Sequence, residues 1–483
     1  MDKKQSVIIN FIWRLLERGG AYAMNFVVSL VLARLLEPSL YGSVALVTAI
    51  TTILQVFVDS GMANSLIQKK DTDDLDYSSV FYFNLVFCLL LYFGLFLAAP
   101  LIGRVYHDLS LIPVIRVLGL TIVVSGVKNV QQAYVAKTMQ FRRFFFATLG
   151  GTLFSAAVGI ALAYLGYGVW ALVFQQLLNV TVNTAILWLT VGWRPRRMFS
   201  WQRLGGLVSY GWKLLVSQLL DTAYLKLYQF IIGLRYSTAD LAFYNRAEQF
   251  PNLIMENTNA SLDSVLLPVL SSEQDDRARV REMTARAIRV STYVLMPLMA
   301  GLAVCAEPTI RLLLTEKWLP CVPYLQLFCL YYAFWPLHTA NLNAIKATGH
   351  SGIFLRLEII KKVVETAILL FTMRYGVMAI MLGLLASGFL SVLINAWPNG
   401  RLLDYSIPQQ LRDALPAILL SAVMGLAILP VTFTGLPDLV KLLIMVPTGA
   451  AIYAGGSLLF RLDSFQYILD AAKKLLRRGK ENA

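Results

Sequence analysis

Polar side chains recur every three or four residues in the apolar segment that begins near residue 241. This spacing places them on one face of an α-helix, and the members of this polar stripe are Asn245, Glu248, Gln249, Asn252, Glu256, Asn259 and Asp263. Such a stripe does not face lipid, so it either lines a hydrated cavity or packs against another helix through side-chain hydrogen bonds. We favour the cavity and predict that Glu248, Asn252 and Glu256 are polar cavity residues or take part in ion coupling.

Two arginines near the start of the chain also share a helical face. Arg14 and Arg18 are four residues apart, and Glu17 follows Arg14 by three. An ordinary ion pair with Glu17 would leave one arginine unmatched. A binding role and snorkelling of the arginines to the membrane surface therefore stay open as alternatives.

A third group lies in the segment that begins near residue 207. Lys213, Ser217, Asp221, Tyr224 and Tyr228 lie along one helical face of this segment. Hydroxyl groups both donate and accept hydrogen bonds, so this face suits a sugar-bearing ligand.

The elements that must position these residues are transmembrane helices. Hydrophobic residues make up 57% of the chain and charged residues 14%, which is too apolar for a soluble domain of this length. Apolar runs of roughly 20 residues, enough to cross a bilayer, follow one another from Val7 to Phe460. The connections between them are too short for a catalytic domain.

The distribution of Lys and Arg predicts the orientation of these spans. We expect about fourteen spans, including an uncleaved first helix, and an even number places both termini on one side. The net charge of +14 fits basic cytoplasmic loops better than a nucleic-acid partner. The side predicted to be cytoplasmic carries Lys3, Lys4, Lys137, Arg142, Arg143, Arg194, Arg196, Arg197, Arg203, Arg277, Arg279, Arg281, Arg401, Arg412 and the tail from Lys473 to Lys480.

The chain also contains an internal repeat with an offset of roughly 200 residues. Three matches occur in the same order: Leu40-Tyr41-Gly42 with Phe243-Tyr244-Asn245, Pro113–Lys137 with Pro323–Lys346, and Tyr167-Gly168-Val169 with Tyr375-Gly376-Val377. We predict an all-α membrane protein of two parallel six-helix bundles that superpose, an N-lobe at 1–200 and a C-lobe at 201–400. Residues 401–483 would add two further transmembrane helices and a basic cytoplasmic tail.

Several local stretches resemble a known family. Ala33–Gly42, Asp59–Ala63 and Ser65–Gln68 resemble the opening of bacterial polysaccharide and lipid-linked oligosaccharide flippases of the Wzx type. These proteins belong to the multidrug/oligosaccharidyl-lipid/polysaccharide exporter superfamily. Tyr244–Ala247 and Leu267–Ser271 resemble the subgroup for colanic-acid or teichuronic-acid polymers, whereas Glu37 and Ala242-Phe243 depart from the usual pattern.

The resemblance implies a flippase that moves an undecaprenyl-pyrophosphate-linked oligosaccharide from the cytoplasmic to the outer leaflet by alternating access. A cationic cavity must then replace the hydration of the pyrophosphate. No family motif fixes these cations, so we assign Arg14, Arg18, Lys213 and Arg246 by position and charge. We assign polar cavity or ion-coupling roles to Glu17, Asp221 and Tyr224 in addition to the stripe.

The expected setting follows from the same resemblance. The protein would be a multi-pass protein of the bacterial cytoplasmic (inner) membrane with both termini cytoplasmic. Its partners would be the lipid-linked oligosaccharide, membrane lipid and other membrane proteins of polysaccharide assembly, with no nucleic acid. No cofactor is expected, although Na⁺ or H⁺ stays open as a coupling cation. The four cysteines lack metal-site spacing, so no metal centre is expected.

Two other functions are alternatives. A drug or small-metabolite exporter of the same superfamily would share the fold, but typically stops at twelve spans and has a more apolar cavity. A membrane polysaccharide polymerase or glycosyltransferase would need an acid/base constellation. Asp71-Thr72-Asp73 matches a short acidic motif of such enzymes, but we interpret it as a solvated loop because no nucleotide-binding domain surrounds it. We therefore expect a transporter that is not an enzyme.

Overall fold

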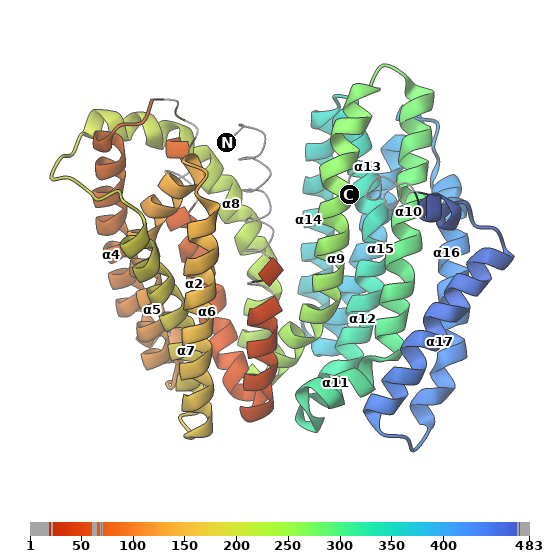
Figure 1. The fold of residues 1–483 in the computed structure, drawn as a ribbon, viewed down its shortest axis with the longest axis horizontal. Helices are drawn as coiled ribbons and strands as arrows, with labels where there is room; N and C mark the ends of the chain where they lie inside the picture. Colours follow the sequence, from red (N-terminus) through yellow and green to blue (C-terminus); the bar gives the residue numbers. More distant parts are fainter. Residues whose placement is uncertain are drawn as a thin grey trace. The chain divides into compact units, whose positions relative to one another are not determined.

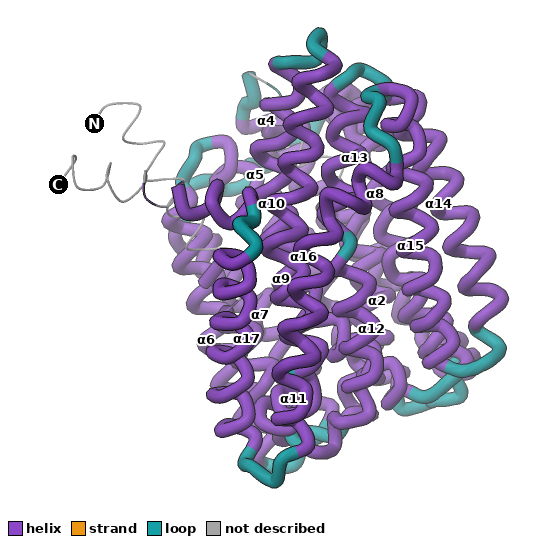
Figure 2. Tube along the Cα trace, turned by 90° about the vertical axis from the view of Figure 1, so that its right-hand side faces the viewer, coloured by secondary structure: helices purple, strands orange, loops and turns teal. Residues whose placement is uncertain are grey.

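The computed structural model of the chain describes residues 19–20, 23–59, 65–67, 69, 71–470 and 473, without the side chains at positions 59, 207, 209–211, 213, 214 and 261. Every regular element in this part of the chain is a helix (Figures 1 and 2). Contacts divide the chain into two compact units, residues 1–242 and 243–483. The predicted all-α fold is confirmed.

Unit 1 begins, within the described residues, with a helical segment at Ala23–Leu35. The helices after it are α2 (Pro38–Asp59), α4 (Asp74–Val105), α5 (Leu111–Lys137), α6 (Phe141–Tyr164), α7 (Val169–Thr190) and α8 (Trp201–Arg235). Helix α8 packs against α2 and α4 and so belongs to unit 1 by its contacts, whereas the repeat predicts a lobe boundary near residue 200. The superposition of the two repeats stays a prediction.

Unit 2 contains most of α9 (Thr238–Ser272) and all later helices. They are α10 (Arg277–Val304), α11 (Ala306–Leu314), the 3-10 helix η1 (Glu316–Cys321), α12 (Val322–Ala333), α13 (Trp335–Ala347), α14 (Ser351–Thr372), α15 (Val377–Leu402), α16 (Ile407–Ile428), η2 (Leu429–Phe433) and α17 (Asp438–Leu459). The expected single span from Pro323 to Lys346 is therefore two helices that meet at Phe334. Pro336 explains the break, because it has no N–H to continue the helical hydrogen bonds.

Nine helices in the described part are long and apolar enough to cross a bilayer, namely α2, α4, α5, α6, α7, α10, α15, α16 with η2, and α17. Helices α8 and α9 are the longest, at 35 residues each, but they carry the polar faces predicted from the sequence. The protein is thus a multi-pass membrane protein. The total of fourteen spans stays a prediction.

Helix α4 shows which solvent surrounds the protein. Its outer face exposes large apolar side chains, for example Leu90 at 64% and Phe93 at 60%. Its inner face buries Ser79 and Asn84. Exposed apolar and buried polar side chains are expected where lipid surrounds a helix, because polar groups then find their partners inside the protein.

Hydrogen bonds and an ion pair attach the acidic connection before α4 to neighbouring residues of unit 1. Asp73 caps α4 by accepting a hydrogen bond from the Asp76 N–H at 2.9 Å, which lowers the pKa of the Asp73 carboxyl. Asp76 is fully buried and forms a 2.6 Å ion pair with Lys69. Lys137 donates a hydrogen bond to Thr72 at 2.5 Å. These contacts give Thr72, Asp73 and Asp76 structural partners, so this connection is more ordered than a simple solvated loop.

Two matched glycines of the sequence repeat have the same local role. Gly168 precedes α7 with φ of 56°, and Gly376 precedes α15 with φ of 107°. Both values lie in the region that favours glycine over residues with a side chain. The repeat therefore conserves a tight connection between consecutive helices within each unit.

Candidate functional site

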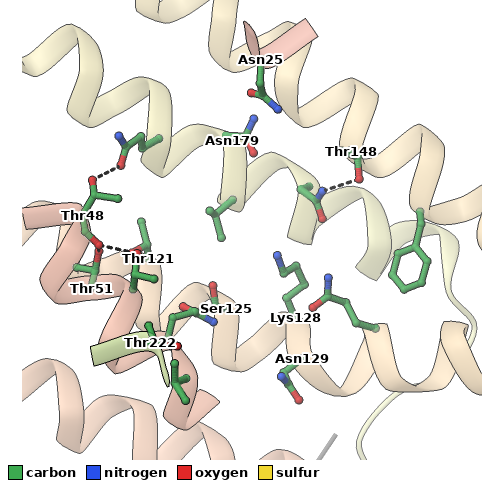
Figure 3. A pocket seen from close by; sticks show the side chains of 18 of the residues that line it. Asn25, Thr48, Thr51, Thr121, Ser125, Lys128, Asn129, Thr148, Asn179 and Thr222 are labelled. Atoms are coloured by element: carbon green, nitrogen blue, oxygen red, sulfur yellow. Dashed lines mark hydrogen bonds between the residues drawn. The ribbon is translucent and has the colours of Figure 1, made fainter. Parts of the chain in front are cut away.

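A polar cavity of about 840 Å³ lies inside unit 1, among α2, α5, α6, α7 and α8 (Figure 3). We call it the N-unit cavity. Its only apolar lining residues in the described part of the chain are Val56, Ile67, Ala133, Ala136, Phe144 and Val180. The remaining lining side chains are amides, hydroxyls and one amine. Its volume is in the range of small-molecule binding sites.

Helix α2 supplies the first wall of the N-unit cavity. Thr48, Thr51, Thr52 and Gln55 line it, and their spacing puts them on one face of the helix. The Thr48 hydroxyl donates a hydrogen bond to Gln176 Oε1 of α7 at 3.2 Å. This bond links two walls of the cavity. Thr51 and Thr52 donate to the Thr48 carbonyl of their own helix, so their oxygens still have acceptor capacity.

Helix α5 supplies the second wall and its charge. Its lining residues are Thr121, Ser125, Lys128, Asn129 and Gln132. Asn129 is buried and donates to the Val58 carbonyl at 3.0 Å, which fixes α5 to the end of α2. Lys128 is the one charged residue among the described residues that line the cavity.

Helix α7 supplies the third wall, with Gln175, Gln176, Asn179 and Asn183. Asn179 Nδ2 donates to the hydroxyls of Thr152 and Ser155 on α6, each at 3.3 Å. Asn183 Nδ2 donates to Thr148 at 3.4 Å, while its Oδ1 accepts no hydrogen bond within the described part of the chain. The amides are thus oriented by α6 and keep acceptor groups for a ligand.

Figure 3 places the labelled side chains of Thr48, Lys128 and Asn179 around one common space, with Asn25 at its upper edge. Amides and hydroxyls can donate and accept hydrogen bonds from many directions, as a hydroxyl-rich ligand requires. A lysine adds a positive charge for a phosphate group. The N-unit cavity can therefore bind a ligand that carries both sugars and an anionic group.

Of the site residues predicted from the sequence, some lie outside the described part of the chain and others are described but do not line the N-unit cavity. Arg14, Glu17 and Arg18 lie outside the described residues, as does the side chain of Lys213. Asp221 and Tyr224 are described on α8 but do not line the N-unit cavity, whereas Gln218 and Thr222 of the same helix do. The N-unit cavity therefore contacts α8 on a face next to the one predicted from the sequence, and the roles of Asp221 and Tyr224 stay predictions.

The remaining assigned residues belong to α9 in unit 2. Arg246 is only 5% exposed, with its guanidinium 5.2 Å from the centre of the Trp318 ring. Its Nη1 donates to Gln249 Oε1 at 2.7 Å. Asn252 is half-buried and Glu256 is exposed. Their part in transport stays a prediction.

Part of the polar stripe packs against neighbouring helices. Glu248 accepts a hydrogen bond from the Tyr332 hydroxyl of α12 at 3.1 Å. Asp263 accepts from Asn343 of α13 at 2.6 Å, and Asn259 accepts from Thr339 of α13. At these positions the stripe has the packing contacts that were the alternative to a hydrated cavity. An ion-coupling role for Glu248 stays a prediction.

Apart from Lys128, the polar residues that line the N-unit cavity are neutral, and this is why they were missed. Lys128 was missed as well, although its charge inside an apolar segment was a signal that could have found it. The sequence analysis followed charged residues, since these are the most costly to place in a membrane. The spacing rule that identified the α9 stripe also describes Thr48, Thr51, Thr52 and Gln55, and again Ser125, Lys128, Asn129 and Gln132. Applied to all polar residues, it would have found two walls of the cavity.

Solved structures share this fold. The lipid II flippase MurJ in an inward closed conformation has a TM-score of 0.74 at 14% identity, covering 94% of this chain and 99% of that one. An inward-facing multidrug resistance MATE family transporter of the MOP superfamily has a TM-score of 0.62 at 16% identity, covering 79% and 94%. At these identities the likeness concerns the fold alone.

Proteins related in sequence indicate the family more specifically than the shared fold does. The succinoglycan biosynthesis transport protein ExoT of Rhizobium meliloti is 24% identical, covering 75% of this chain and 73% of its own. The lipopolysaccharide biosynthesis protein WzxC of Escherichia coli is 24% identical, over 68% and 67%. The teichuronic acid biosynthesis protein TuaB of Bacillus subtilis is 21% identical, over 89% of each chain. Residues 31–323, more than half of the chain, match the family described as "Polysaccharide biosynthesis protein", and the chain belongs to that family.

Proposed function

We propose that this chain is a flippase that moves an undecaprenyl-pyrophosphate-linked oligosaccharide, the repeat unit of a surface polysaccharide, from the cytoplasmic to the outer leaflet by alternating access. The observation that carries the proposal is the N-unit cavity, a large polar space within a protein that faces lipid. Family membership and a fold shared with a lipid II flippase support it.

The chemistry of the cavity matches the polar part of this substrate. Sugars present hydroxyl groups that donate and accept hydrogen bonds, and Asn179, Gln176 and Thr48 offer complementary groups. The pyrophosphate is anionic, and a cation in a low-dielectric site stabilises an anion more than it would in water. Lys128 is positioned for this contact. The lipid tail would remain in the bilayer.

The polar lining also discriminates against the first alternative. A drug exporter of the superfamily is expected to have a more apolar cavity, because most drugs bury apolar surface. Here amides and hydroxyls dominate the lining. The relative ExoT is named as a transport protein, which supports transport over the polymerase or glycosyltransferase alternative.

The cellular setting belongs to the proposal as well. The protein would lie in the bacterial cytoplasmic membrane with both termini cytoplasmic, and would work beside other membrane proteins of polysaccharide assembly. Transport would be coupled to a Na⁺ or H⁺ gradient. Among the described residues, no group of three or more His, Cys, Asp or Glu side chains could hold a metal ion.

Replacing Lys128 tests the proposal directly. Lys128→Met removes the charge and keeps the length of the side chain, whereas Lys128→Arg keeps the charge. A hydrogen bond to a charged group contributes about 1.5–3 kcal/mol, so we expect Lys128→Met to reduce surface polysaccharide at least roughly tenfold. Lys128→Arg should retain part of the export. Surface polysaccharide and intracellular lipid-linked oligosaccharide are measured in a strain that lacks the native gene.

Two further variants keep the result interpretable. Arg104→Met removes one positive charge from an exposed position of α4 in the same unit, and export should stay normal. Gln132→Ala lies one helical turn from Lys128 on the cavity wall, and should lower export without removing charge. Normal export by both Lys128→Met and Gln132→Ala, at wild-type protein levels, would show that this cavity is not the transport site. Drug tolerance that depends on Lys128 would favour the drug exporter instead.

A further inference from the structure

A second cavity, of about 790 Å³, lies in unit 2 where the first turns of α10 and α16 meet the connection between α15 and α16. We call it the arginine cavity. Four arginines line it: Arg277, Arg281, Arg289 and Arg412. A guanidinium group carries a positive charge and presents five N–H donors. The cavity therefore concentrates positive charge at a helix end, where a membrane protein leaves the hydrocarbon core.

Two of these arginines are held in place by carboxylates. Arg277 forms an ion pair with Asp404 at 3.0 Å, and Arg289 forms one with Asp413 at 3.3 Å. The Tyr405 hydroxyl, on a residue only 2% exposed, donates to the other oxygen of Asp413 at 2.7 Å. The two aspartates thus balance two arginines and fix the walls of the cavity.

The other two arginines supply an excess of charge. Among the described residues, Arg281 and Arg412 have no carboxylate within ion-pair distance. Glu282 is the third carboxylate on the lining, and it pairs at 2.8 Å with Arg286, which does not line the cavity. Arg281 is half-buried. Two guanidinium groups therefore remain available to an anion, and their planar donors match phosphate geometry.

The surface beside the cavity is apolar. On α16, Leu411, Leu415 and Leu419 are 42%, 46% and 56% exposed and four residues apart, so they form one ridge that begins next to Arg412. In a membrane protein such a ridge faces lipid chains. A ligand in the arginine cavity would thus have a charged group on the arginines and an apolar part along α16. A lipid has this division, whereas a soluble phosphate does not.

We propose that the arginine cavity binds a phosphate-bearing anion, and that this anion is the head group of an acidic membrane lipid. Basic pockets between transmembrane helices commonly bind acidic head groups on the cytoplasmic side, which is the side that the charge distribution predicts for these arginines. The site involves only residues of unit 2. It does not depend on the transport role of the N-unit cavity.

Lipid binding to the purified full-length protein tests this inference. The double variant Arg281→Gln/Arg412→Gln removes both available charges. The control Arg279→Gln/Arg356→Gln removes two exposed positive charges of the same unit, on α10 and α14, that neither line the cavity nor pair with a carboxylate on its lining. Titrations use short-chain phosphatidylglycerol, with short-chain phosphatidylcholine and inorganic pyrophosphate as separate probes. Bound lipid is counted by native mass spectrometry, and thermal unfolding confirms that each variant is folded.

We expect the wild type and the control to bind phosphatidylglycerol, and the Arg281/Arg412 variant to bind it at least roughly tenfold more weakly, because two charge-assisted hydrogen bonds are lost. Weak binding of phosphatidylcholine would show that net negative charge is required. Binding of pyrophosphate as tight as that of phosphatidylglycerol would identify a soluble phosphate compound as the ligand and overturn the lipid assignment. Equal affinity of wild type and Arg281/Arg412 variant for both anions would overturn the site itself.

Discussion

Arg246 is a buried guanidinium with structural contacts, and a part in transport is predicted for it from the sequence. Its ring contact with Trp318 and its hydrogen bond to Gln249 are both made within unit 2. Trp318 itself is completely buried. A planar guanidinium is suited to this position, since it stacks on an aromatic face and still donates hydrogen bonds at its edge. Lysine can supply the charge but not the stacking plane.

Replacement of Arg246 should therefore affect two measurements differently. Arg246→Ala loses the ring contact, the hydrogen bond and the charge, so we expect about 1–3 kcal/mol less stability and the loss of polysaccharide export. Arg246→Lys should restore part of the export but less of the stability. Thermal unfolding in detergent and surface polysaccharide in cells are compared with those of Arg235→Ala, which removes an exposed arginine at the end of α8. Wild-type export by Arg246→Ala would contradict the pyrophosphate role that the sequence predicts for Arg246.

Helix α2 is positioned by a close backbone approach at its first turn. A Cβ atom built on Gly42 would lie 1.6 Å from the carbonyl oxygen of Thr238, the first residue of α9. The contact is made within unit 1, which extends to Ala242. Small residues allow such backbone approaches in membrane proteins. The threonines that line the N-unit cavity begin six residues later on α2, so this contact helps to set their position.

Gly42→Ala tests whether the close approach of Gly42 to the backbone of Thr238 holds α2 in place. The added methyl group must push two backbones apart, and we expect a loss of about 1–3 kcal/mol together with reduced export. The matched control is Gly94→Ala in α4, where no neighbouring atom lies within 4 Å of the added Cβ. That change should be neutral or stabilising by up to about 1 kcal/mol, because alanine favours the helix. Similar unfolding temperatures for the two variants would contradict the packing argument.

Across unit 1 as a whole, the basic connections gather at one end. Lys137 Nζ donates to the Leu66 carbonyl at 3.2 Å, and the Arg196 N–H donates to Ser78 at 3.0 Å. These bonds bring together connections that are far apart in the sequence. The connections at 106–110 and 165–168 carry no Lys or Arg. This asymmetry is the basis of the orientation predicted by the positive-inside rule, and the orientation stays a prediction.

Thiol labelling can test this orientation. Cysteine is introduced at exposed positions by Arg197→Cys and by Tyr167→Cys, and a membrane-impermeant maleimide is applied to intact cells and to opened cells. The four native cysteines are buried, so their reaction should be slow. We expect Tyr167→Cys to react in intact cells and Arg197→Cys only after the membrane is opened. Labelling of Arg197→Cys in intact cells would reverse the predicted topology.

The sequence by itself determined the membrane class, the helical composition, the family and the tight connections before Val169 and Val377. These features depend on local hydropathy and on backbone preferences that neighbouring residues carry. It also placed the amide and acidic residues of the α9 stripe on one helical face. It could not decide which of these residues meet a cavity and which meet another helix.

Tertiary structure alone decided where the cavities lie. The N-unit cavity combines Lys128 with neutral residues from α2, α5 and α7. The arginine cavity combines α10 with the start of α16, more than a hundred residues later. A neutral amide or hydroxyl has the same local pattern whether it binds a neighbouring helix or a ligand. The difference arises only from how the helices pack, because packing determines which hydrogen-bonding groups remain without protein partners.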